Sequence, residues 1–92
     1  MINDLSKDQK IKLKRLFDKK NYSKFETQIE KLGSIENLPT YLKMGYAGSK
    51  VLNPNSKKED YLNATIIFEK IYSKDKSNTE ALYNLILSSL KA

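Results

Sequence analysis

The 92-residue chain contains no cysteine and no histidine. Without cysteine it has no disulfide bond, no catalytic thiolate and no thiolate metal ligand, and without histidine it lacks the commonest general base and transition-metal ligand. Its 11 acidic residues are scattered, none is paired among apolar residues in a way that would raise a pKa, and no glycine-rich phosphate loop is present. We therefore predict that the protein is not an enzyme and uses no metal and no cofactor.

Long apolar runs are also missing. No segment approaches the roughly 18 to 20 apolar residues that span a bilayer, and the opening "MINDLSKDQKIKLKRLF" lacks the apolar core of a signal peptide. An apolar content of 39% with 30% charged residues is typical of a globular domain. We expect one small domain without a membrane span, located in the cytoplasm.

Arginine is nearly absent, since Arg15 is the only one among 17 basic residues, yet the net charge is +6. A basic chain can bind nucleic acid, an anionic membrane or an acidic protein, and a lysine-rich composition can also reflect coding bias. Proteins that read nucleic acids usually use arginine for bidentate contacts, so we do not expect nucleic acid as the main partner. A basic domain that binds RNA or an anionic surface through its lysine-rich first helix stays open as the alternative.

What the sequence does contain is helical periodicity, which predicts an all-α fold. Ser6 is placed as the N-cap of a first helix, and Gly33 as the C-terminal cap of a second helix whose apolar stripe includes Phe25. The third helix is expected to begin near Glu36 or Asn37. The predicted pairs cover residues 6–33 and 36–73, and a final helix covers 78–91.

Loop and capping signals in the rest of the chain indicate five helices in all. Pro39 is expected in the first turn of the third helix, where proline is tolerated. The stretch "NPNSKKED", residues 53–60, reads as a loop, and Ser77 or Asn78 is expected to cap the fifth helix.

A short Ala64 one turn before a bulky Phe68 is informative about packing. A lone amphipathic helix has no need of a small residue there, whereas a helix that another backbone approaches closely does. We predict that a neighbouring helix crosses at Ala64 and that Phe68 fills the space beside it.

This fourth helix resembles the second helix of the tetratricopeptide repeat (TPR) family. Tyr61, Ala64, Phe68 and Ile71 stand where that family has its aromatic, small, aromatic and aliphatic residues, and "KDKSNTEALYNL" resembles the passage into a next repeat. The third helix, with Tyr41, Met44 and Gly45, resembles a first helix. The resemblance implies an array of antiparallel helical hairpins over residues 1–92, although an α-hairpin array of another kind would share the pattern.

Two departures from the family pattern stand in the sequence. Phe25 occupies the position of the small residue, so the first pair is expected to pack more loosely or at a changed angle. The segment from Leu52 to Asp60 is longer than the family's tight turn, which predicts an extended loop.

The resemblance also implies a function, namely a protein–protein interaction module that binds a peptide or a neighbouring domain in a groove lined by the first helix of each pair. Asn84 is the sharpest candidate because its amide can donate to and accept from a peptide backbone, but it could equally cap a turn or face solvent. The groove residues carried over from the family are Lys10, Lys14, Leu42, Tyr46, Ser49, Lys50, Tyr83, Asn84 and Leu87.

The tyrosines are expected to divide by face. Tyr22, Tyr41 and Tyr61 are predicted in the core, while Tyr46 and Tyr83 are predicted to offer aromatic surface to a partner.

The fifth helix is apolar on two sides, so one neighbouring helix cannot bury it. Two interpretations are open. The helix packs on a further domain of a longer chain, since repeats of this kind are found attached to transferase domains, or it forms a homodimer. The contact residues of that predicted homodimer are Leu82, Leu85, Ile86 and Leu90.

Overall fold

The computed structural model describes residues 5–92, which form five α-helices and one short 3-10 helix and contain no strand. The all-α prediction is confirmed. The elements are α1 (Lys7–Asp18), α2 (Tyr22–Glu30), η1 (Ile35–Asn37), α3 (Thr40–Leu52), α4 (Lys58–Lys74) and α5 (Thr79–Lys91).

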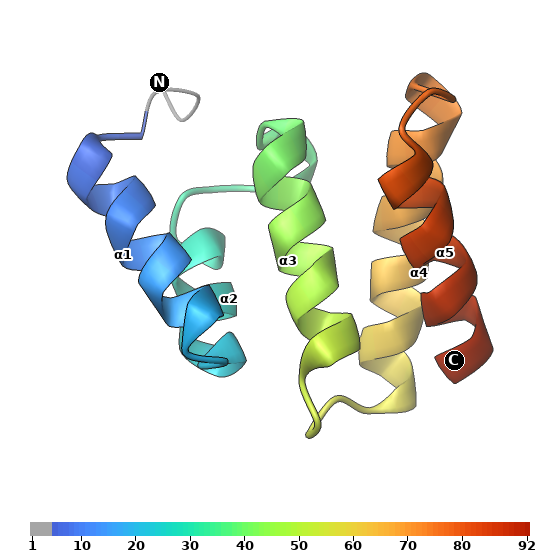
Figure 1. The fold of residues 1–92 in the computed structure, drawn as a ribbon, viewed down its shortest axis with the longest axis horizontal. Helices are drawn as coiled ribbons and strands as arrows, with labels where there is room; N and C mark the ends of the chain where they lie inside the picture. The colour runs from blue at the N-terminus through green and yellow to red at the C-terminus, as the bar shows by residue number, and fades with distance from the viewer. Residues whose placement is uncertain (1–4) are drawn as a thin grey trace.

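The helices lie in two layers (Figure 1). α1, α3 and α5 lie nearer the viewer, and α2 and α4 lie behind them. Each helix packs chiefly on the helix that follows it, and α3 also contacts α5. The shortest dimension, 20 Å, fits two layers of helices packed about 8–10 Å apart.

Capping side chains mark three of the helix starts. The Ser6 hydroxyl accepts a hydrogen bond from the Gln9 N–H at 3.1 Å, and the Gln9 side chain accepts one from the Ser6 N–H at 2.9 Å, so the predicted N-cap is part of a full capping box. Asn78 caps α5 by accepting from the Ala81 N–H at 3.0 Å, as predicted. The Asp60 carboxylate accepts from the Lys57 N–H at 2.9 Å and stabilises the start of α4.

The predicted start of the third helix is wrong. Residues Ile35–Asn37 form the separate η1, and α3 begins only at Thr40, because Leu38 and Pro39 are extended, with ψ of 154° and 153°. A proline disfavours helical geometry in the residue before it, so Leu38 breaks the chain into two elements.

Two other predicted boundaries also shift. Lys58, Glu59 and Asp60 belong to the first turn of α4, so the expected loop over residues 53–60 ends at residue 57. At the end of α2, the cap is Lys31, and Gly33 lies beyond it with φ of 138°, a conformation that glycine adopts readily.

The packing predicted at Ala64 is confirmed. Ala64 and Phe68 of α4 are both 0% exposed, and they form one buried cluster with Ala47 and Val51 of α3. Leu85 and Leu87 of α5 pack against the same cluster. The methyl side chains of Ala47 and Ala64 let α3 and α4 approach closely, and Phe68 fills the space shared by three helices.

The contact between α2 and α3 also pairs a large residue with a small one. Phe25 of α2 is bulky where the family pattern has a small residue, and the small residue lies opposite it, in α3. A Cβ atom added to Gly45 would lie 3.1 Å from Cζ of Phe25, so the ring occupies the space that the glycine leaves. This contact belongs to the second buried cluster, which includes Leu13, Ile29 and Leu42.

The expected faces of two tyrosines are wrong. Tyr41, predicted in the core, is 51% exposed, and Tyr46, predicted on the surface, is buried. Leu42 and Tyr46 are one turn apart and pack in one cluster with Phe25 and Ile29 of α2, and Tyr41 lies off that face. Tyr22 is buried, Tyr61 is half-buried and Tyr83 is exposed.

None of the helices in residues 5–92 combines the length and the apolarity needed to cross a bilayer.

Candidate binding groove

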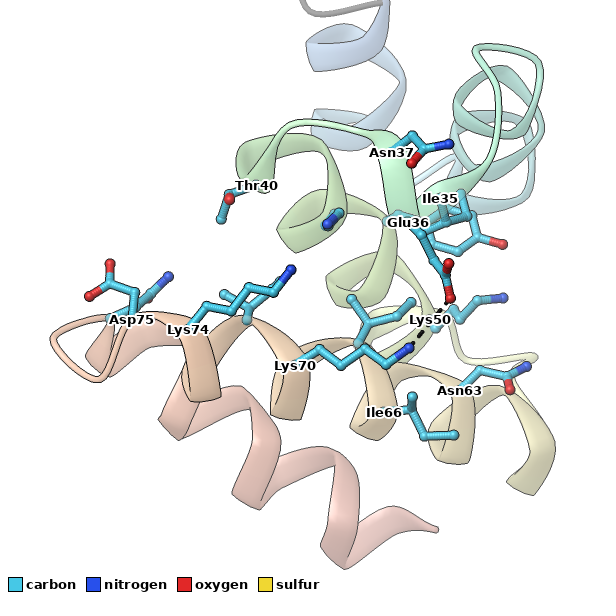
Figure 2. Close-up of a pocket in the computed structure, with 15 residues that line it drawn as sticks. Ile35, Glu36, Asn37, Thr40, Lys50, Asn63, Ile66, Lys70, Lys74 and Asp75 are labelled. Atoms are coloured by element: carbon cyan, nitrogen blue, oxygen red, sulfur yellow. Dashed lines mark hydrogen bonds and ion pairs between the residues drawn. The ribbon is translucent and has the colours of Figure 1, made fainter.

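A groove of about 780 Å³ runs between α3 and α4 and is walled on one side by η1. We call it the α3–α4 groove. Figure 2 shows η1 and α3 on one side and α4 on the other, while α5 packs on the opposite side of α4. Its principal lining residues are Glu36, Lys43, Tyr46, Lys50, Ile66, Ile67, Lys70, Ile71 and Lys74.

Helical periodicity brings these side chains to one surface. Lys43, Tyr46 and Lys50 recur at intervals of three and four residues along α3, and Ile66, Ile67, Lys70, Ile71 and Lys74 do so along α4. Residues three and four apart share a helix face. Along α4, apolar side chains of the lining alternate with lysines.

Lys50 is among the lining residues of the groove and joins three helices. Its ammonium lies 3.0 Å from Oε1 of Glu26 in α2 and 3.5 Å from Oδ1 of Asp60 in α4, and its side chain is only 9% exposed. The same ammonium lies 4.8 Å from the centre of the Tyr46 ring. The Tyr46 hydroxyl donates to Oε2 of Glu30 at 2.6 Å. These contacts tie α2, α3 and α4 together beside the groove.

The network shifts two pKa values. Burial raises the pKa of Tyr46 to about 12, and the hydrogen bond to Glu30 acts in the same direction, while the charge of Lys50 opposes it. Burial lowers the pKa of Lys50, but the hydrogen bond and charge of Glu26, followed by Tyr46 and Asp60, outweigh burial and raise it overall. Lys50 is therefore charged at neutral pH, and its charge stabilises the fold.

The raised pKa of Tyr46 predicts alkaline destabilisation. The folded state holds the phenol proton more tightly than the unfolded chain, so this stabilisation is complete below pH 10 and is lost as pH rises toward 12. A shift of this size corresponds to about 2–3 kcal/mol. Urea denaturation across this pH range should show a smaller loss for Tyr46→Phe than for the wild type. Tyr83→Phe, an exposed control, should behave like the wild type, and equal losses in all three proteins would contradict the prediction.

Three of the predicted partner-binding residues sit in or beside the core. Leu42 is 4% exposed and Ser49 is 0% exposed, with its hydroxyl donating to the Tyr46 carbonyl at 2.6 Å, so both pack the interior of the fold instead of facing a partner. Leu87 is half-buried against the cluster around Phe68.

The other predicted residues do not form one surface. Tyr46 and Lys50 line the α3–α4 groove, although neither is freely exposed. Lys10 and Lys14 are exposed on α1, and Lys14 pairs with Asp18 at 3.1 Å.

Tyr83 and Asn84 lie on α5, outside the lining of the groove. The Asn84 amide donates to the Glu80 carbonyl of its own helix at 2.9 Å. This contact lies within α5 and caps no neighbouring turn.

The sequence reasoning missed the groove residues Lys43, Ile66, Lys70 and Lys74. One local signal was available, because Ile66 is an isoleucine that stands off the Ala64–Phe68 stripe. In the structure its side chain is 53% exposed. The position of the lysines relative to η1 and α3 depends on the tertiary fold.

A second, smaller hollow of about 310 Å³ lies between α2, the 53–56 segment and the start of α4, and it is lined by polar residues. Within residues 5–92, no three acidic side chains gather in a way that could hold a metal ion.

Comparisons of the chain with protein-family models, with curated proteins and with solved structures return no match.

Proposed function

We propose that this protein is a protein–protein interaction module of the TPR-like kind, and that it holds a peptide segment of its partner in the α3–α4 groove. The observation that carries the proposal is a concave surface lined by lysines in which the apolar side chain of Ile66 remains 53% exposed. Binding sites in proteins are typically concave and mostly apolar, with a few polar groups that set orientation.

The exposure of Ile66 supports this assignment. The opposite part of α4 is fully buried at Ala64 and Phe68, so α4 already has the apolar contacts that hold it in the fold. Ile66 is nevertheless 53% exposed in the groove, beside the half-buried Ile67 and the buried Ile71. An exposed apolar side chain within a concave site offers a partner an anchor that the fold itself does not need.

The proposed site differs from the one that the family resemblance implies. The expected groove follows the first helices, which are α1, α3 and α5, whereas the α3–α4 groove is formed by α3, α4 and η1. The hairpin packing at Ala64 supports a TPR-like arrangement, and the family assignment is part of the proposal.

The alternative, a basic module that binds RNA or an anionic surface, is favoured by α1. Lys7, Lys10, Lys12 and Arg15 are exposed there, and none of them forms an ion pair within residues 5–92. Binding dominated by phosphate contacts weakens steeply as salt rises, whereas binding anchored by apolar side chains does not. A salt titration of any ligand found therefore separates the two functions.

The proposal predicts that Ile66→Glu weakens the binding of selected peptides. We expect a random peptide library displayed on phage, selected on the wild-type protein, to yield ligands that bind this variant at least about tenfold more weakly. Ile86→Glu is a matched control, because Ile86 is also 53% exposed but lies on α5. Dissociation constants from fluorescence anisotropy give the comparison.

Two outcomes would overturn the proposal: selected peptides that bind both variants as tightly as the wild type, or peptides that lose affinity only with Ile86→Glu. Thermal melts of both variants check that each one is folded.

The homodimer through Leu82, Leu85, Ile86 and Leu90 stays a separate proposal. Ile86 and Leu90 are 53% and 79% exposed, while Leu82 and Leu85 are half-buried within the monomer. The cytoplasmic location likewise remains a prediction.

A further inference from the structure

We propose that the α3–α4 groove binds an acidic peptide with interspersed apolar side chains, and that carboxylates of this peptide displace Glu36 from Lys70. The inference rests on the proposed function and specifies the chemistry of the partner.

The groove has cationic side chains that the fold does not use. Lys43 of α3 and Lys74 of α4 line the groove, and neither forms an ion pair within residues 5–92. Lys50 differs from them, because Glu26 and Asp60 already neutralise it. The rim therefore offers two ammonium groups to a ligand.

The two acidic residues of the lining leave it positively charged, because Lys43, Lys70 and Lys74 outnumber them. The Asp75 carboxylate is held in the α4–α5 turn, where Oδ1 accepts from the Ser77 N–H at 3.1 Å and from the Ser77 hydroxyl at 2.5 Å. Glu36 is the only other acid among the groove residues.

Glu36 shows what kind of group the groove accepts. Its Oε1 lies 3.4 Å from Nζ of Lys70, so a carboxylate on η1 reaches across to an ammonium on α4 (Figure 2). The two side chains are 79% and 63% exposed. An ion pair this exposed contributes little stability, so a carboxylate from a partner can replace Glu36 at small cost. Glu36 thus acts as an internal stand-in for an acidic side chain of the ligand.

The spacing of the lining side chains along α4 indicates the length and residue pattern of the peptide. Lys70 and Lys74 are one turn apart, and the exposed Ile66 and half-buried Ile67 lie one turn before Lys70. From Asn63 to Lys74 the groove follows α4 for about 16 Å, which matches about 11 residues of a helical peptide. Acidic residues one turn apart, interleaved with apolar residues, complement this surface. The net charge of +6 attracts such a peptide over longer distances.

The test uses three fluorescein-labelled peptides of about 12 residues with leucines at helical spacing. The other positions carry glutamate in the first peptide, glutamine in the second and lysine in the third. Fluorescence anisotropy with the full chain should give the tightest binding for the glutamate peptide and the weakest for the lysine peptide, and the preference for glutamate should shrink as salt is raised.

Three variants localise the effect. Lys74→Glu should lower the affinity for the glutamate peptide about threefold to tenfold. Glu36→Gln should raise this affinity about twofold to fivefold, because the competing carboxylate is gone. Lys12→Glu changes the net charge by the same amount as Lys74→Glu but lies on α1, and it should change affinity less than about twofold. Lys74→Gln replaces Lys74→Glu if the charge reversal lowers the melting temperature.

Equal binding of the glutamate and glutamine peptides, or no binding of either, overturns the inference. An effect of Lys12→Glu as large as that of Lys74→Glu also overturns it, because the charge would then act without the groove. A single-stranded oligonucleotide that binds more tightly than the glutamate peptide, with the same dependence on Lys74, overturns it in favour of nucleic acid. The proposed function survives each of the first two results if library-selected peptides still depend on Ile66, and it fails separately if they do not.

Discussion

Lys50→Ala is expected to lower the free energy of unfolding by about 2–4 kcal/mol, since it leaves a partly buried carboxylate without its cation. The Glu26 side chain is only 15% exposed, and Lys50 provides its ion pair at 3.0 Å. The Asp60 side chain is 36% exposed, so losing its contact with Lys50 costs less stability. The substitution also removes the ammonium from the Tyr46 ring. Urea denaturation followed by circular dichroism measures the change.

Lys14→Ala is the matched control for this prediction. The Lys14–Asp18 pair has nearly the same length, 3.1 Å, but its side chains are 77% and 58% exposed. An exposed pair at helical spacing contributes at most about 0.5 kcal/mol. The comparison therefore isolates burial, because the distance and the charges are matched.

A double substitution separates the charge from the packing. Lys50→Met with Glu26→Gln removes both charges while keeping side chains of similar size, so it should be clearly more stable than Lys50→Ala. If Lys50→Ala and Lys14→Ala cost the same, the Lys50 network does not hold α2, α3 and α4 together.

Phe68→Ala is expected to lower the free energy of unfolding by about 3–5 kcal/mol, which is a large part of the stability of a domain of this size. Phe68 is 0% exposed and shares its cluster with Ala47 and Val51 of α3 and with Leu85 and Leu87 of α5. Removing the ring leaves a cavity where three helices meet. Thermal and urea denaturation provide the measurement.

Leu62→Ala serves as the control on the same helix. Leu62 is 46% exposed, so its truncation should change the free energy of unfolding by no more than about 0.5 kcal/mol. A loss for Phe68→Ala no larger than that for Leu62→Ala would mean that the α3, α4 and α5 helices do not share a core at this point.

Interactions between residues close in sequence were predictable. Ser6 and Gln9 are three residues apart, as are Asn78 and Ala81, so the caps of α1 and α5 follow from local sequence alone. The small Ala64 before Phe68 likewise indicated a close helix crossing, because a small side chain within an apolar stripe makes room for a neighbour.

Boundaries were harder to predict where two local signals compete. Pro39 is compatible with a first helical turn, but it also forces Leu38 out of helical geometry, and the second effect prevails. In the 53–60 segment, the polar composition indicated a loop, whereas the carboxylate of Asp60 stabilises a helix start.

The sequence by itself determined the all-α class, the caps and the face of α4 that is buried, because each depends on side chains within about one helical turn of one another. Only the tertiary structure decided that Lys50 is a buried structural cation and that Lys43, Ile66 and Lys74 share a groove. Those facts depend on which faces of α2, α3, α4 and η1 meet. The contact between Lys50 and Glu26 joins residues 24 positions apart, and that between Glu36 and Lys70 joins residues 34 apart. A lysine has the same local signature whether it ends beneath a partner helix or in water, so its role is set by long-range packing.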